Sequence, residues 1–149
     1  HDLVIIGQAH GEDEEPQLIA QQLGLRQQIH WLDNTSDDEL TAAYTAADLF
    51  VLVSFYEGFG LPILEAMQCD TPVIASSTTS AGEVTGAGGV TVDPTQLDAI
   101  ATAIDTILQT PGERDAWIRN GRQWRQRFSW QRAAAETLAL YEDVLRKQE

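Results

Sequence analysis

Short apolar runs alternate along this chain with longer stretches in which apolar residues recur at helical spacing. Strand and helix therefore alternate, which predicts an α/β fold with a Rossmann-like parallel sheet and helices on both faces. The runs rich in valine, isoleucine and leucine predict five buried strands, at residues 3–7, 29–32, 49–53, 72–75 and 89–92. Helices are predicted at about residues 17–23, 36–46, from 61 onward, 97–108 and from 110 onward, and the second of them opens with a capping-box pattern of Ser36 and Glu39.

Residues 54–67 connect the third predicted strand to a helix through two glycines. Gly58 and Gly60 allow backbone conformations closed to other residues, and they leave room for a ligand to approach. Pro62 suits the first helical turn, because its missing N–H costs nothing there. The amides just before Pro62 lack partners within the helix and lie at the positive end of its dipole. This stretch therefore predicts an anion-binding site.

Two carboxylates flank this turn, Glu57 before it and Glu65 after it, with seven residues between them. Glu57 lies on the loop, where it can face the crevice at the carboxyl end of the strand. Glu65 lies about one turn into the helix, on a face that can look toward the same crevice. If an anion binds the amides between them, Glu57 and Glu65 can accept hydrogen bonds from hydroxyls on either side of that anion. A sugar and a ribose joined by a diphosphate fit that description.

This block, Glu57 and Glu65 with Gly-Phe-Gly-Leu-Pro-Ile-Leu between them, resembles the signature of the retaining family-4 glycosyltransferases. Enzymes of that family have the two-domain GT-B architecture. The likeness covers most of the chain, because further landmarks follow in the order of the family. They are found at residues 69–75, 83–84, 92–94 and 128–130. The resemblance identifies the chain as the C-terminal, nucleotide-sugar-binding half of such an enzyme.

The resemblance implies a role for each residue of the block. Glu57 would contact hydroxyls of the transferred sugar as a positioning group, and it is the one candidate catalytic residue. Glu65 would bind the ribose hydroxyls. Thr35 would lie in the loop that contacts the nucleobase, and Glu83 would brace the site from a polar loop at residues 76–83. The full set of implied donor-binding residues is Gly58, Phe59, Gly60, Leu61, Pro62, Glu65, Thr35 and Glu83.

Two residues depart from the family pattern. Asp33 and Asp70 stand where family members usually carry glycine. The first departure puts the shape of the nucleobase loop in question. The second raises the possibility of backbone strain at the end of the helix that contains Glu65.

The resemblance also implies segments upstream of residue 1. These are the first strand of the nucleotide-binding domain, a basic pair that binds the phosphates, and the acceptor-binding domain. The sequence has no Lys or Arg between Arg26 and Arg114, so the expected anion site has no cation nearby in the sequence. We therefore expect residues 1–149 to form the donor-binding domain of a longer hexosyltransferase and to be inactive alone. A glycan or another hydroxyl compound would be the acceptor, bound by the upstream domain.

Composition and charge narrow the remaining function classes. A length of 149 residues with 43% apolar residues suits one domain with a sizeable core. A formal charge of −14 argues against nucleic-acid binding. No apolar run approaches the roughly 20 residues of a membrane span, and no signal peptide is visible. A single cysteine, Cys69, fits a reducing compartment, so we expect a cytoplasmic protein with no membrane contact through this domain.

Several weaker signals have plainer explanations. His10 lies beside acidic residues, but a lone histidine among flexible acids defines no ligand geometry, and we expect no metal and no cofactor besides the nucleotide-sugar substrate. The arginines at residues 114–132 have mixed spacing beside acids, so we expect them to be solvated rather than to bind a membrane or nucleic acid. Thr110, Pro111 and Glu113 predict a capped helix start.

Three alternatives stay open at the level of sequence. The two glutamates could form a glycosidase-like pair, for which the separation of the carboxyl groups would decide the stereochemistry. The chain could instead be a non-catalytic Rossmann-type nucleotide-binding module. It could also be a purely structural interaction domain.

Overall fold

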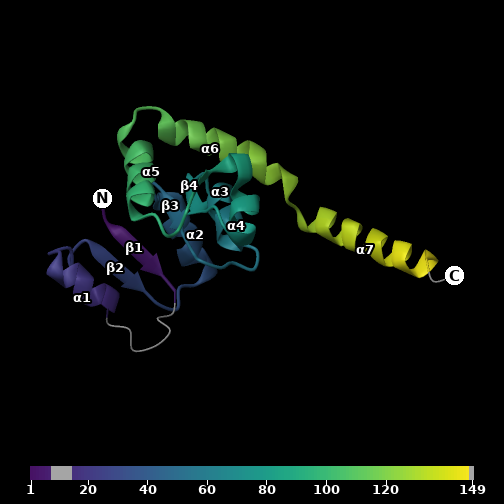
Figure 1. Cartoon of the computed structure of the whole chain (residues 1–149), viewed down its shortest axis with the longest axis horizontal. Coiled ribbons are helices and arrows are strands. Elements are labelled where there is room, and N and C mark those ends of the chain that lie inside the picture. The colour runs from purple at the N-terminus through teal and green to yellow at the C-terminus, as the bar shows by residue number, and fades with distance from the viewer. Residues whose placement is uncertain (8–14, 148–149) are drawn as a thin grey trace. The chain divides into compact units, whose positions relative to one another are not determined.

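The computed structural model describes residues 1–7 and 15–147 (Figure 1). Its internal contacts divide the chain into two compact units, His1–Ala43 and Tyr44–Glu149. The described residues contain the five expected strands, and every strand pair is parallel. The strands form a two-stranded sheet in the first unit and a three-stranded sheet in the second. The α/β fold class is therefore confirmed.

The first unit contains a pair of parallel strands and an α-helix between them in sequence. β1 (Leu3–Ile6) and β2 (Ile29–Leu32) pair in register from Leu3 opposite Ile29 to Ile6 opposite Leu32, and α1 (Glu15–Gln22) connects them. α2 (Asp37–Ala46) begins with the predicted capping box. Ser36 N–H donates to Glu39 Oε2 at 2.8 Å, and Glu39 N–H donates to Ser36 Oγ at 3.4 Å.

The second unit is built on a sheet in which the strand order is β3-β4-β5. β4 lies at the centre, and all its residues are buried. Figure 1 shows the sheet between α5 on one side and α3 and α4 on the other. The elements are β3 (Phe50–Leu52), α3 (Leu61–Gln68), β4 (Val73–Ser76), α4 (Thr79–Thr85), β5 (Val90–Val92), α5 (Leu97–Gln109), α6 (Glu113–Trp124) and α7 (Trp130–Arg146).

The core of the second unit lies on both faces of this sheet. On one face, Ile74 of β4 packs with Val92 and with Ile107 of α5. Because successive side chains of a strand point to opposite faces, the neighbours of Ile74 face the other way, toward α3 and α4, which both contact β4. Ile63 and Met67 of α3 are almost fully buried. The sheet is thus covered on both faces, as expected from its apolar strands.

Two local predictions were wrong. Residues 76–83 were expected to form a flexible loop, but α4 begins at Thr79, because Ala81 and Val84 bury one face of that segment against the sheet. Thr110 was expected to cap α6, but it ends α5, and Gly112 is the N-cap residue with a φ of 84°. A glycine reaches that conformation without strain, so the helix starts after it and Pro111 lies outside.

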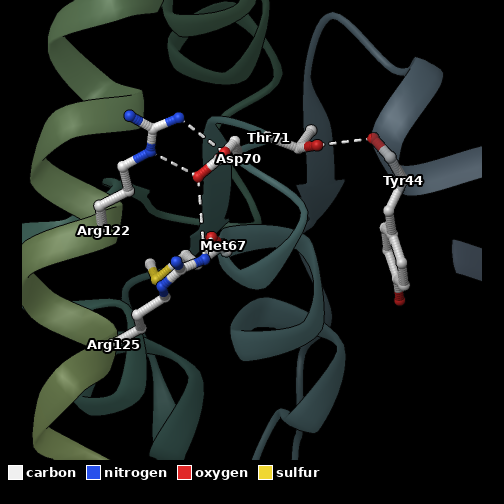
Figure 2. A network of polar contacts seen from close by, with 6 residues as sticks. All are labelled: Tyr44, Met67, Asp70, Thr71, Arg122 and Arg125. Atoms are coloured by element: carbon white, nitrogen blue, oxygen red, sulfur yellow. Dashed lines mark hydrogen bonds and ion pairs between the residues drawn. The ribbon is translucent and has the colours of Figure 1, made fainter.

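Asp70 has the left-handed backbone that glycine favours. Its φ is 59°, in the turn that follows α3. Arg122 donates from Nε and Nη2 to the two carboxylate oxygens of Asp70 at 2.7 Å each, and Arg125 Nη1 lies 3.8 Å from Oδ1 (Figure 2). The Arg122 guanidinium lowers the pKa of the Asp70 carboxyl. The ion pair thus offsets part of the strain that Asp70 introduces.

Arginines of the C-terminal region contact the body of the second unit more than was expected. Besides its contact with Asp70, Arg125 donates from Nη1 to the carbonyl oxygen of Met67 at 2.6 Å. Arg114 donates to the carbonyl oxygens of Ala47 and Asp48. Arg127 lies over the ring of Trp124, 4.5 Å from its centroid. Arg114 and Arg125 are therefore partly buried by contacts with the fold, whereas Arg127 is exposed, as expected for a solvated arginine.

Substitutions at Asp70 should separate backbone strain from the ion pair. Asp70→Ala removes the ion pair and leaves a Cβ in the left-handed region, whereas Asp70→Gly removes both. We expect the glycine variant to be more stable than the alanine variant by about 1 kcal/mol at pH 7, measured by urea unfolding.

Because the pKa of folded Asp70 is lowered, its ion pair stabilises the fold above the unfolded pKa of about 3.9. The free energy of unfolding of wild type, relative to that of Asp70→Gly, should therefore decrease as the pH falls through the pKa of folded Asp70. Equal free energies of unfolding for Asp70→Gly and Asp70→Ala would contradict backbone strain at residue 70.

Candidate functional site

The loop after β3 enters α3 through a glycine that no side chain could replace without strain. Gly60 is the N-cap residue, is buried, and has a φ of 96° and a ψ of 43°. No side chain caps the helix, and Pro62 lies in its first turn. Pro62 has no N–H, and Ile63 N–H donates to the Gly60 carbonyl oxygen at 3.0 Å, so among the first three residues of α3 only Leu61 has an amide for which the described part of the chain shows no acceptor. A helix start without a side-chain cap can accept an anion, so the anion site expected from the sequence stays a prediction.

The two glycines of the loop should respond differently to alanine. A Cβ on Gly60 would lie 3.0 Å from Ile63 Cδ1 and would occupy a backbone with positive φ, whereas a Cβ on Gly58 would meet nothing within 4 Å. We expect Gly60→Ala to lower the free energy of unfolding by about 1–2 kcal/mol. Gly58→Ala, the matched control, should change it by less than about 0.5 kcal/mol. Thermal and urea unfolding of both variants would measure the difference, and equal losses would contradict the observed loop conformation.

Glu57 is fixed on this loop by three hydroxyl groups. Ser54 Oγ donates to Glu57 Oε1 at 2.8 Å. The backbone N–H of Glu57 donates to Thr79 Oγ1 at 3.3 Å, and Ser80 Oγ donates to the Glu57 carbonyl oxygen at 2.8 Å. Within the described part of the chain, no hydrogen bond to Glu57 Oε2 is observed. One carboxylate oxygen of Glu57 is therefore fixed by the fold, and the other can accept a hydrogen bond from a ligand.

Thr79 has an unusual backbone at the start of α4. Its φ is 56°, which a β-branched residue rarely adopts. Its side chain accepts the hydrogen bond from Glu57, so the strained residue contacts the candidate site directly. Strain of this kind persists where the surrounding contacts over-determine the conformation, as they do between this turn and the Glu57 loop.

Glu65 also has one fold partner. It is exposed on α3, and the hydroxyl of Tyr44 donates to its Oε2 at 3.1 Å. Tyr44 is buried, and its ring contacts the ring of Phe50 edge-on at a centroid distance of 5.4 Å. Burial and the nearby Glu65 carboxylate raise the pKa of the Tyr44 hydroxyl well above its usual range, so that it remains a donor. Glu65 and Glu57 thus flank the uncapped start of α3, each with one oxygen bonded to a hydroxyl of the fold.

Comparison with known proteins decides the family. The sequence profile of the family described as glycosyl transferases group 1 matches residues 2–124. This chain belongs to the group 1 glycosyltransferases. It is 42% identical over 113 residues to the O-antigen chain mannosyltransferase B of Escherichia coli, a match that covers 76% of this chain and 30% of that protein. The chain spans about a third of the length of the curated relatives it matches.

Solved glycosyltransferase structures share the fold. Sucrose-phosphate synthase from Thermosynechococcus elongatus superposes with a TM-score of 0.84 at 28% identity, over 98% of this chain and 39% of that one. The Anabaena protein HepE, solved in complex with UDP-glucose, superposes with a TM-score of 0.79 at 26% identity, over 93% of this chain and 40% of that one. The chain therefore has the fold of the C-terminal domain of a GT-B glycosyltransferase.

Most of the predicted site residues of this glycosyltransferase chain lie together. The loop and the first turns of α3 contain Glu57, Glu65 and the residues between them. Glu83 is exposed on α4. Thr35 follows β2 in the first unit, whereas the other predicted site residues belong to the second unit.

The sequence reasoning did not assign four residues that contact the glutamates. Ser54 and Ser80 had weak signals, since the first lies in the signature block and the second in a polar segment after a strand. Thr79 lies in the same segment, but its backbone strain has no sequence signal. Tyr44 is 21 positions before Glu65, and nothing in the sequence connects the two.

In residues 1–7 and 15–147, no group of three or more His, Cys, Asp or Glu side chains could bind a metal ion. His10 and its acidic neighbours lie outside the described residues. No helix in the described part of the chain is long and apolar enough to cross a membrane.

Proposed function

We propose that this chain binds a nucleoside-diphosphate sugar at residues 57–65 and serves as the donor-binding domain of a retaining hexosyltransferase. One observation carries the proposal: Glu57 and Glu65 flank an uncapped helix start, and each has one carboxylate oxygen bonded by a hydroxyl of the fold. The amides of α3 suit the diphosphate. The other oxygens of the two glutamates suit the hydroxyls of the sugar and the ribose.

The comparisons support the donor class. The HepE structure contains UDP-glucose, and the E. coli relative is named a mannosyltransferase. A nucleotide sugar is therefore the donor class we propose, and a hexose is the transferred group. The acceptor is a glycan or another hydroxyl compound, bound by a further domain of a longer polypeptide.

The mechanism follows from what this site offers. Bond cleavage places negative charge on the leaving diphosphate, and preorganised amides at the start of α3 stabilise that charge as it develops. Further cations would come from outside residues 27–113, because that range contains no Lys or Arg. No cofactor or metal is proposed for this step. The product is proposed to keep the anomeric configuration of the donor.

Glu57 acts in this proposal as a positioning group. Its side chain is fixed by Ser54 and its backbone by Thr79 and Ser80, so it orients the sugar without reorganising. We propose no covalent intermediate on a protein nucleophile.

Transfer by the full-length polypeptide tests the function. The polypeptide would be incubated with UDP-glucose, ADP-glucose or GDP-mannose and a panel of hydroxyl acceptors, and the product examined by proton NMR. We expect transfer from one donor and a one-bond C1–H1 coupling constant of the product that indicates the same anomeric configuration as the donor. An inverted product would contradict retention. Hydrolysis of simple glycosides without any nucleotide would favour a glycosidase, and nucleotide binding without turnover would favour a non-catalytic module.

A further inference from the structure

Tyr44 is a buried residue that contacts the proposed site from outside the signature block. It lies in the last turn of α2, it is 8% exposed, and its hydroxyl donates to Glu65 Oε2 at 3.1 Å. Glu65 itself is exposed on α3, where a long side chain is free to take several rotamers. The hydrogen bond from Tyr44 selects among those rotamers.

The position of Tyr44 is fixed at both its ring and its backbone. Its ring packs edge-on against Phe50 of β3. Thr71 Oγ1 donates to the Tyr44 carbonyl oxygen at 2.6 Å, as Figure 2 shows. Thr71 follows Asp70, which Arg122 binds through both carboxylate oxygens. The turn after α3 is therefore bonded to Arg122 of α6 on one side and to Tyr44 of α2 on the other. A donor fixed in this way can orient an exposed carboxylate.

We propose that Tyr44 is the positioning residue of Glu65: its hydroxyl occupies Oε2 and directs Oε1 toward a ribose hydroxyl of the bound nucleotide. The inference rests on the proposed function, since it takes Glu65 as the group that binds the ribose. Tyr44 does not touch the ligand. Its effect on binding passes through Glu65, which distinguishes it from a residue that only stabilises the core.

A double-mutant cycle with matched ligands tests this role. Wild type, Tyr44→Phe, Glu65→Ala and the double variant of the full-length polypeptide would be titrated by calorimetry with UDP, GDP and ADP. The tightest of the three would then be compared with its 2′-deoxy and 3′-deoxy forms. Phenylalanine keeps the ring that packs on Phe50, so the variant removes only the hydroxyl. Tyr141→Phe, on an exposed side chain of α7, controls for loss of a phenol elsewhere.

The expected result is selective. Tyr44→Phe should raise the Kd of the nucleoside diphosphate by about 5-fold, the size of one hydrogen bond, and Tyr141→Phe should leave it unchanged. The effect of Tyr44→Phe on Kd should disappear in the Glu65→Ala background. It should also disappear for the deoxy nucleotide whose Kd Glu65→Ala does not change. The ratio of two Kd values on one variant does not depend on the folded fraction, so partial unfolding would not obscure the result.

The contrary results separate the two levels of the proposal. Equal weakening of the ribose and deoxy forms by Tyr44→Phe, or additive effects in the double variant, would overturn the positioning role and leave the proposed function standing. If wild type binds none of the nucleoside diphosphates, the proposed function fails, and the role of Tyr44 fails with it.

Discussion

Replacement of Glu57 by glutamine is expected to lower kcat for sugar transfer in the full-length polypeptide by about 10²-fold. Glutamine has the shape of glutamate, and its amide oxygen can still accept the hydrogen bond from Ser54. The fold of the loop should therefore survive. The charge that strengthens hydrogen bonds to the sugar hydroxyls is lost, and with it the orientation of the sugar in the transition state.

A matched control and the kinetic pattern make this prediction specific. Glu142→Gln makes the same charge change on an exposed residue of α7 and should leave kcat within about 2-fold of wild type. Initial rates at varied donor concentration would separate kcat from KM. A variant with normal kcat and raised KM would show that Glu57 contributes only uniform binding, contrary to its proposed positioning role.

Glu65→Ala is expected to raise the Kd of a nucleoside diphosphate by about 10- to 100-fold. The reason is the loss of one hydrogen bond between a ribose hydroxyl and a charged acceptor, which is worth about 1.5–3 kcal/mol. Because Glu65 is exposed, its removal should not unfold the chain. Calorimetric titration of the full-length polypeptide would measure the change.

The control for Glu65 is another exposed acid on a helix of the same unit. Asp105→Ala, on α5, alters the net charge by the same amount and should leave the Kd unchanged. An unchanged Kd in Glu65→Ala would contradict the assignment of this residue to the ribose. Equal losses in both variants would indicate a general effect of net charge.

The topology of the sheet explains why the site assembles where it does. β3 and β4 are neighbouring parallel strands, so their carboxyl ends meet at one edge of the sheet. Ser54 and Glu57 follow β3, and Thr79 and Ser80 follow β4. The hydrogen bonds between the Glu57 loop and the first turn of α4 are therefore a consequence of strand pairing.

The sequence predicted what depends on neighbours along the chain. The strands, the capping box of Ser36 and the glycine turn into α3 were all predicted from local pattern, because each is set by residues close in sequence. Asp70, which stands where family members usually carry glycine, has the positive φ that glycine favours. The ion pair between Arg122 and the carboxylate of Asp70 joins residues 52 positions apart, so it could not be predicted from local pattern.

The features that the sequence did not predict depend on tertiary packing. The segment 76–83 was read as a loop because its serines and threonines favour turns, and only burial of Ala81 and Val84 makes α4 favourable. Tyr44 reaches Glu65 through a contact between residues 21 positions apart, and packing of its ring against Phe50 fixes its place. The pairing of the strands in sheets of two and three joins residues far apart in the sequence, and the apolar runs do not specify it.

Hydrogen–deuterium exchange with and without donor tests the central claim most directly. The full-length polypeptide would be exchanged alone and at saturating UDP-glucose, ADP-glucose or GDP-mannose, and its peptides compared by mass spectrometry. A bound diphosphate on the amides of α3 should slow exchange in residues 54–68 with one of the donors and leave α7 unchanged. Glu65→Ala should reduce that protection. Protection confined to other segments, or none with any donor, would contradict a donor site between Glu57 and Glu65.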